Sequence, residues 1–136
     1  MSASAETLCV PPERVAVIWP HVEGFLRAAV ERCGDWTLPT LRGCLDRQEM
    51  LLWVLWDGAA IRAAAVTEVV IVPRGKICRI VACGGARAVR WPRALAPIEA
   101  YARDLGCCAM RIDGRRGWQR VFADYATQWI TLEKGL

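Results

Sequence analysis

Residues 92–105 have helical periodicity and lie between two strand-like segments, and this order constrains the fold more than any other feature of the sequence. Their apolar side chains recur at three- and four-residue spacing, at Leu95, Ile98, Ala102 and Leu105. Residues 76–83 and 107–112 on either side are apolar and short enough to be strands. A helix that joins two strands of one sheet makes a right-handed crossover, so we expect these strands to be parallel neighbours.

The earlier part of the chain predicts two helices and a strand meander. Residues 15–33 have a one-sided apolar pattern, in which Pro20 is expected to bend or split the helix, and residues 38–48 follow Thr37 as a cap. Turn signals separate three predicted antiparallel strands, at 50–56, 60–72 and 76–83. After the crossover we expect a short helix at 116–125 and a last strand at 127–132.

Length and composition favour one folded domain over residues 1–136, with residues 1–10 as a flexible tail. An apolar content of 54% with 24% charged residues excludes a mostly disordered chain. The longest apolar stretch, 50–72, is interrupted by Asp57, Arg62 and Glu68, which argues against a membrane span. Since residues 1–12 lack the features of a secretory signal, we expect a cytoplasmic protein.

The charged and sulfur-containing residues narrow the classes of ligand. The seven cysteines are odd in number and lack paired metal-ligand spacing, and His21 is the only histidine, so we expect free thiols and no metal site. Arginine makes up sixteen of the eighteen cations, which favours a phosphate-bearing ligand or reflects codon usage. A net charge of +4 without a known nucleic-acid motif makes nucleic acid an unlikely partner.

The element order, at this length, resembles that of the acetyltransferases of the GNAT superfamily, over nearly the whole chain. The pattern of residues 95–102 is similar to the central helix of that family, and Tyr125 stands where the family has a tyrosine. The run 114–118, Gly-Arg-Arg-Gly-Trp, resembles GNAT-like proteins encoded by bacteriophages. The resemblance implies an α/β (α+β) fold: a mixed, mostly antiparallel central sheet with helices on both faces and one parallel strand pair.

The resemblance also implies an acetyl-CoA site between the third meander strand and the next helix. The residues at those positions are Val81, Cys83, Gly84, Gly85, Arg87, Arg90 and Arg93. The family places a glycine-rich phosphate loop there, whereas residues 86–91 of this chain contain no glycine and end in Trp91, which would fill space that the family leaves to the cofactor. The arginines either replace the missing backbone contacts with charge-assisted bonds or form a solvated basic rim.

For catalysis the resemblance implies Tyr125 as the acid that protonates the thiolate and Glu68 as the base that accepts the amine proton. The structural alternatives are a solvent-facing Glu68, a Tyr125 that closes the core, and buried thiols at Cys83 and Cys107. The implied function is acetyl transfer from acetyl-CoA to an amine of a small molecule or a protein. The alternative is a non-catalytic GNAT-like protein, from a phage, that binds a protein partner in virion assembly or host interference, with Trp and Arg side chains as anchors.

Overall fold

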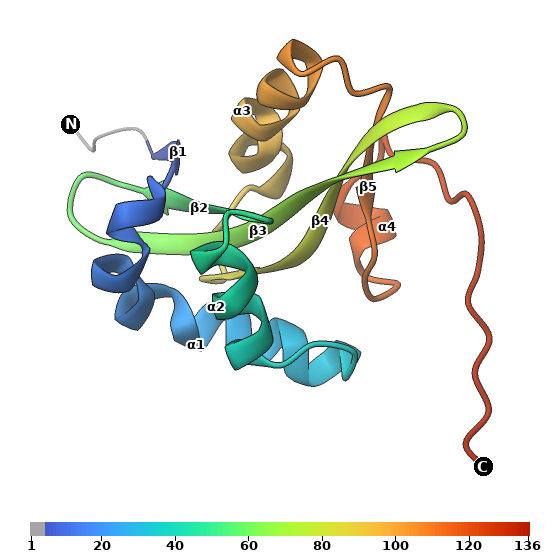
Figure 1. Ribbon diagram of the computed structural model, residues 1–136, viewed down its shortest axis with the longest axis horizontal. Coiled ribbons are helices and arrows are strands. Elements are labelled where there is room, and N and C mark those ends of the chain that lie inside the picture. Colours follow the sequence, from blue (N-terminus) through green and yellow to red (C-terminus); the bar gives the residue numbers. More distant parts are fainter. Residues whose placement is uncertain (1–4) are drawn as a thin grey trace.

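The computed structural model describes residues 5–136 and contains one five-stranded sheet. The strands lie side by side in sequence order, as β1 (Glu6–Cys9), β2 (Leu51–Trp56), β3 (Ile61–Val72), β4 (Gly75–Gly85) and β5 (Ala109–Ile112) (Figure 1). The first four pair antiparallel, and β4 pairs with β5 in parallel. The parallel neighbours that the crossover helix predicts are therefore confirmed, and with them the mixed sheet.

Helices cover both faces of this sheet. A short 3-10 turn, η1 (Pro12–Arg14), leads into α1 (Val15–Cys33), which packs with α2 (Leu38–Asp46) on one face; α3 (Trp91–Asp104) and the four-residue α4 (Trp118–Val121) lie on the other (Figure 1). Thr37 caps α2 by accepting a hydrogen bond from the Thr40 N–H. Pro20 lies inside α1 and does not split it. No helix in the part of the chain that the structure describes is long and apolar enough to cross a membrane.

The two faces of the sheet have separate cores. The first core, under α1 and α2, consists mainly of aliphatic side chains, including Val22, Leu26, Leu41, Leu45, Leu52 and Val66. The second core, under α3 and α4, contains aromatic rings and thiols, including Trp53, Cys78, Cys83, Leu95, Ile98 and Phe122. Away from the register shifts in the ladders, successive side chains of a strand alternate between the two faces, as in Val54 and Trp53 or Ala64 and Ala65.

Both ends of the chain differ from the sequence-based prediction. The predicted flexible tail is wrong for Glu6–Cys9, which pairs with β2 as strand β1; residues 1–4 of that tail lie outside the described residues. β1 covers the backbone groups of β2 that the meander leaves unpaired. At the other end, the predicted helix at 116–125 is shorter in the structure, where it forms only α4. The predicted strand at 127–132 is not formed, because this segment makes no ladder hydrogen bonds with the outer edge of β5.

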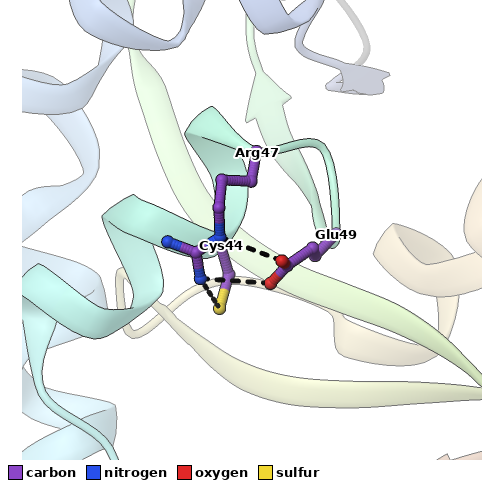
Figure 2. A network of polar contacts seen from close by, with 3 residues as sticks. All are labelled: Cys44, Arg47 and Glu49. Atoms are coloured by element: carbon purple, nitrogen blue, oxygen red, sulfur yellow. Dashed lines mark hydrogen bonds and ion pairs between the residues drawn. The ribbon is translucent and has the colours of Figure 1, made fainter.

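The connection from α2 to β2 is closed by a side-chain network (Figure 2). The Arg47 guanidinium donates to both carboxylate oxygens of Glu49, at 2.9 and 3.1 Å, and to Cys44 Sγ at 3.6 Å. Burial raises the pKa of the Cys44 thiol, so this cysteine behaves as a core side chain rather than a nucleophile. The network stabilises a turn in which Gln48 adopts a positive φ of 59°.

Candidate active site

The parallel strands β4 and β5 separate after a short shared ladder. Their last pair is Ile80 with Ile112, and β4 continues to Gly85 without a partner on that side. The register with β3 shifts here too: Val66 pairs with Ala82 and Thr67 with Ile80, so Val81 is an extra residue, a β-bulge. Residues 81–85 therefore present unpaired backbone groups to the opening between β4 and β5. Val81, one of the predicted cofactor residues, lies at its start.

Gly84 and Gly85 are required by packing within the sheet. They lie in β4 opposite Ala64 and Ala63. A Cβ atom at Gly84 would overlap the backbone carbonyl of Phe25 in α1, and one at Gly85 would lie 2.7 Å from the Ala63 Cβ. The missing side chains allow α1 and β3 to approach β4 closely, which accounts for both glycines without a phosphate ligand.

The loop from β4 to α3 carries arginines in place of a glycine cradle. Arg87, Arg90 and Arg93 are exposed, and within residues 5–136 none of them forms an ion pair. Within this described loop no residue has positive φ, so the backbone does not form a concave nest of N–H groups. No side chain caps α3, and Pro92 lacks an N–H, so the helix offers the free N–H groups of Trp91 and Arg93. An anion here would be held by guanidinium groups and the helix N-terminus.

Four aromatic rings form a row between the start of α3 and the end of α4. In order, their centroids are 5.5, 5.4 and 5.3 Å apart: Trp91, Trp118, Phe122 and Tyr125. Gly114 belongs to this packing, because a Cβ there would lie 2.5 Å from Trp118 Cδ1. Trp91, Trp118 and Tyr125 are partly buried against the second core, and Phe122 is buried within it. Whether Trp91 fills the space that a cofactor would need stays a prediction.

Tyr125 ends the aromatic row with its hydroxyl directed at α3. The hydroxyl donates a hydrogen bond to Glu99 Oε2 at 2.7 Å. Burial, followed by this bond to a carboxylate, raises the pKa of Tyr125 well above its usual range. A hydroxyl with a raised pKa is a poor acid toward a thiolate, because a thiol has a pKa of about 8.5. Tyr125 is suited to positioning Glu99 rather than to donating its proton.

Glu68 does not meet Tyr125. It lies on β3 and pairs with Arg79 of β4, to which it is bound by a salt bridge. Arg79 stands between Cys78 and Ile80, whose side chains belong to the second core, so Arg79 and Glu68 point to the opposite face, toward α1 and α2. Arg79 also approaches Asp113 at 3.6 Å. The structure therefore separates the two predicted catalytic residues by the thickness of the sheet.

The thiols of the second core are buried and inert. Burial raises the pKa of Cys83 to about 12 and that of Cys78 to about 11. Cys83 is 9% exposed, so its side chain is part of the core under α3 and α4, and only its backbone borders the opening. Among residues 5–136 no cluster of three or more His, Cys, Asp or Glu side chains is placed to hold a metal ion.

A hollow of about 750 Å³ lies on the outer side of β5, which we call the β5 hollow. Its walls are β5, the loop 113–117, α4 and residues 122–132, with Glu99 from α3 and Arg74 from the β3–β4 turn. Residues 126–136, which follow α4, have no regular structure and extend away from the sheet (Figure 1). Ile112, Asp113 and Gly114 line the hollow at the end of β5, and its lining includes no residue of β4.

Glu99 is the functional candidate that the sequence analysis missed. It follows Ile98 on α3 and is half-buried at the border of the apolar face. The local signal was a carboxylate within the apolar pattern of residues 95–102, and its pairing with Tyr125, 26 residues away, depends on the tertiary structure.

Comparison with known proteins identifies the fold. No family model matches the chain, and no curated protein matches it. Solved structures do: an aminoglycoside acetyltransferase from an uncultured soil metagenomic sample is 11% identical, with 98% of this chain and 97% of that chain covered and a TM-score of 0.72. A GNAT family acetyltransferase of Staphylococcus aureus is 17% identical over 100% of both chains, with a TM-score of 0.65.

An acetyl-CoA complex is also among the similar structures. This predicted acetyltransferase from Clostridium acetobutylicum is 12% identical, with 96% of each chain covered and a TM-score of 0.65. The likeness of residues 114–118 to phage-encoded proteins stays a prediction. The chain, with its mixed sheet and the crossover helix α3, matches these structures over 96–100% of its length. The chain therefore has the fold of the GNAT-family acetyltransferases.

Proposed function

We propose that the protein is an N-acetyltransferase that transfers the acetyl group of acetyl-CoA to an amine. The observation that carries this proposal is the opening between β4 and β5, with the bulge at Val81 and the free N-terminus of α3 at its end. The unpaired edge of residues 81–85 can hydrogen-bond an extended ligand that carries amides, as a further strand would. The pantetheine arm of acetyl-CoA is such a ligand.

The phosphates of acetyl-CoA would bind the arginines of the β4–α3 loop. Arg87, Arg90 and Arg93 are exposed and have no ion-pair partner among the described residues, so their donors are available. Gly84 and Gly85 leave no space for a phosphate, since α1 and β3 already occupy the positions of their missing side chains. Side chains bind less tightly than a preformed backbone cradle, because ordering each long side chain costs conformational entropy. We expect weak, salt-sensitive binding.

The transfer itself requires one bond to form and one to break. The amine nitrogen attacks the thioester carbonyl, the new C–N bond forms, and the C–S bond breaks. We assign the proton that the nitrogen loses to the Glu99 carboxylate, which Tyr125 holds in place. The departing thiolate takes its proton from water, because a group with a pKa of about 8.5 leaves without a strong acid.

Calorimetry with acetyl-CoA tests the proposal. We expect the unsubstituted protein to bind and the double variant Arg87→Ala/Arg90→Ala to bind about a hundredfold or more weakly, since each charge-assisted bond contributes about 1.5–3 kcal/mol. Arg103→Ala is the matched control, because this exposed arginine lies in the last turn of the same helix. If the double variant and the unsubstituted protein bind acetyl-CoA with equal affinity, Arg87 and Arg90 do not bind its phosphates.

Turnover is measured in parallel as thiol release with a panel of amines. The panel includes an aminoglycoside, because aminoglycoside acetyltransferases are among the similar structures. If the unsubstituted protein neither binds acetyl-CoA nor turns it over with any amine, the proposal is contradicted. That outcome would favour the alternative, a GNAT-like protein that binds a partner without catalysis.

A further inference from the structure

Strand β5 is an open edge of the sheet. It pairs with β4 on one side, and among residues 5–136 no segment pairs with its outer side. An edge strand presents unpaired N–H and C=O groups, to which a further strand can add. Met110 and Ile112 of β5 pack against the second core. Arg111 between them is in register with Arg79, so its side chain leaves β5 on the face of α1 and α2. A strand added to β5 should therefore be apolar on the face that it shares with Met110 and Ile112.

Residues 129–132 have the composition and the alternation of such a strand. Their large apolar side chains are not buried in either core, since Trp129 is 62%, Ile130 76% and Leu132 91% exposed. Within the segment that follows Tyr125, no backbone group bonds to another backbone group. In an extended strand Ile130 and Leu132 lie on one face and Trp129 on the other. The two aliphatic side chains match the apolar face of β5, and the tryptophan ring matches the face that carries an arginine.

The same segment crosses its own β5 instead of running along it. Its path begins at Tyr125, which is bound to α3 on the aromatic face, and Gln119 of α4 then donates to Thr127 Oγ1 at 2.8 Å. Two residues later, the Trp129 ring lies 4.6 Å from the Arg111 guanidinium, whose side chain leaves β5 on the opposite face. The chain thus passes around β5 and forms no ladder with it. The contacts at Tyr125 and Thr127 set the direction in which the segment leaves its own chain.

We propose that residues 129–132 of one copy of this chain add as a strand to the outer edge of β5 in a second copy, and that the exchange is reciprocal. A second copy is free to turn its β5 edge into the direction of the departing segment, whereas the chain's own β5 is fixed. Each copy supplies one edge and one strand, so a twofold dimer pairs both edges and closes. Ile130 and Leu132 then lie in the β5 hollow of the other copy, which Met110 and Ile112 line. The exchange is independent of the proposed function, because none of these side chains is assigned to acetyl-CoA or to the amine.

The mass of the full chain in solution tests the exchange. Light scattering after size-exclusion chromatography should give the mass of two chains for the unsubstituted protein. The variant Ile130→Asp/Leu132→Asp places charges on the apolar face of the added strand, so its mass should fall to that of one chain. The variant Val17→Asp/Ile71→Asp is the matched control, because these side chains of α1 and β3 are also exposed, at 60% and 80%. The control should keep the mass of two chains.

Two proline variants test the backbone bonds without adding charge. Ile130→Pro and Thr131→Pro are compared, because the N–H groups of neighbouring residues in a strand point to opposite sides and one of them faces β5. Proline lacks that N–H, so at least one of the two variants should have the mass of one chain. Circular dichroism checks that each variant is folded, and both positions are exposed in the single chain.

Isotope-filtered NMR on a mixture of labelled and unlabelled chains identifies the copy that the segment contacts. We expect NOEs from Ile130 and Leu132 to Met110 and Ile112 between different chains. Three results would overturn the proposal: the mass of one chain for the unsubstituted protein, the mass of two chains for Ile130→Asp/Leu132→Asp, or these NOEs within one chain alone. The first of them would leave the edge to a strand of another protein, and the last would show that the segment pairs with its own β5.

Discussion

The cores on the two faces of the sheet are built from different kinds of side chain. Under α1 and α2 the core is aliphatic, with Val22, Leu26 and Leu41 fully buried. Under α3 and α4 the core is aromatic, and its rings carry polar atoms that need partners: the Trp53 indole N–H donates to Thr67 Oγ1 at 3.0 Å, and Tyr125 donates to Glu99. Aliphatic side chains interdigitate without such requirements.

The two faces of the sheet are also covered by helices of different length. The aliphatic face covers the sheet with the 19-residue α1, whereas the aromatic face is covered by the 14-residue α3 and the four-residue α4. Glu99 of α3 and Trp118, Phe122 and Tyr125 of the aromatic face line the β5 hollow. We therefore expect substitutions on the first face to change the free energy of unfolding, and those on the second face to change ligand binding.

The largest effect is expected from Leu26→Ala on the aliphatic face. Leu26 is 0% exposed, so removing its branched end leaves a cavity and should lower the free energy of unfolding by about 2–5 kcal/mol in urea titrations. Val17→Ala, at a position that is 60% exposed on the same helix, should change it by less than about 0.5 kcal/mol. Acetyl-CoA affinity of the folded Leu26→Ala protein should stay the same. If folded Leu26→Ala also loses affinity for acetyl-CoA, the expectation that the first face affects stability alone is wrong.

A smaller effect is expected from Gly84→Ala, which tests whether this glycine packs α1 or binds a cofactor. The added methyl group meets the Phe25 backbone, and the overpacking should destabilise the protein by about 1–3 kcal/mol. Gly24→Ala is the control: no atom lies within 4 Å of its Cβ position, and alanine in the helix should stabilise by about 1 kcal/mol. Thermal unfolding measures both. If Gly84→Ala keeps its stability but loses affinity for acetyl-CoA, Gly84 serves to bind the cofactor rather than to pack α1.

The smallest effect is expected from Tyr125→Phe on the aromatic face. The ring stays in the aromatic row and one hydrogen bond to Glu99 is lost, so the free energy of unfolding should fall by about 0.5–1.5 kcal/mol. Turnover should fall less than about tenfold, with the change mainly in KM for the amine, because the hydroxyl positions Glu99. A fall in kcat of about a hundredfold at unchanged KM would instead identify Tyr125 as the proton donor to the thiolate.

Much of the fold was predictable because its signals are local. The turn residues Asp57-Gly58 define the β2–β3 hairpin, Thr37 caps α2, and the apolar period of residues 92–105 marks α3. Strand β1 was not predictable in this way: residues 6–9 are a short segment that becomes a strand only because β2 offers an unpaired edge. Residues 127–132 show the reverse, a β-prone sequence that finds no ladder in the structure.

The candidate site was predictable only in part, for a related reason. The positions of Val81 and of Arg87, Arg90 and Arg93 follow from the element order, so the sequence could place them near the strand-to-helix connection. The partners of Glu68 and Tyr125 could not be found, because Arg79 lies across the β3–β4 ladder and Glu99 lies on α3, 26 residues from Tyr125. The faces of residues 82–85 could not be found either, since a one-residue bulge at Val81 changes the alternation for the rest of β4.

The sequence by itself determined the order of helices and strands and the parallel crossover, since periodicity and turn residues act over a few positions and the hand of a crossover is general. Only the tertiary structure decided that Gly84 and Gly85 serve packing, that Glu68 binds Arg79 on the aliphatic face, and that Glu99 meets Tyr125 beside the β5 hollow. Each of these depends on contacts between residues distant in the chain, and such contacts exist only once both faces of the sheet are covered.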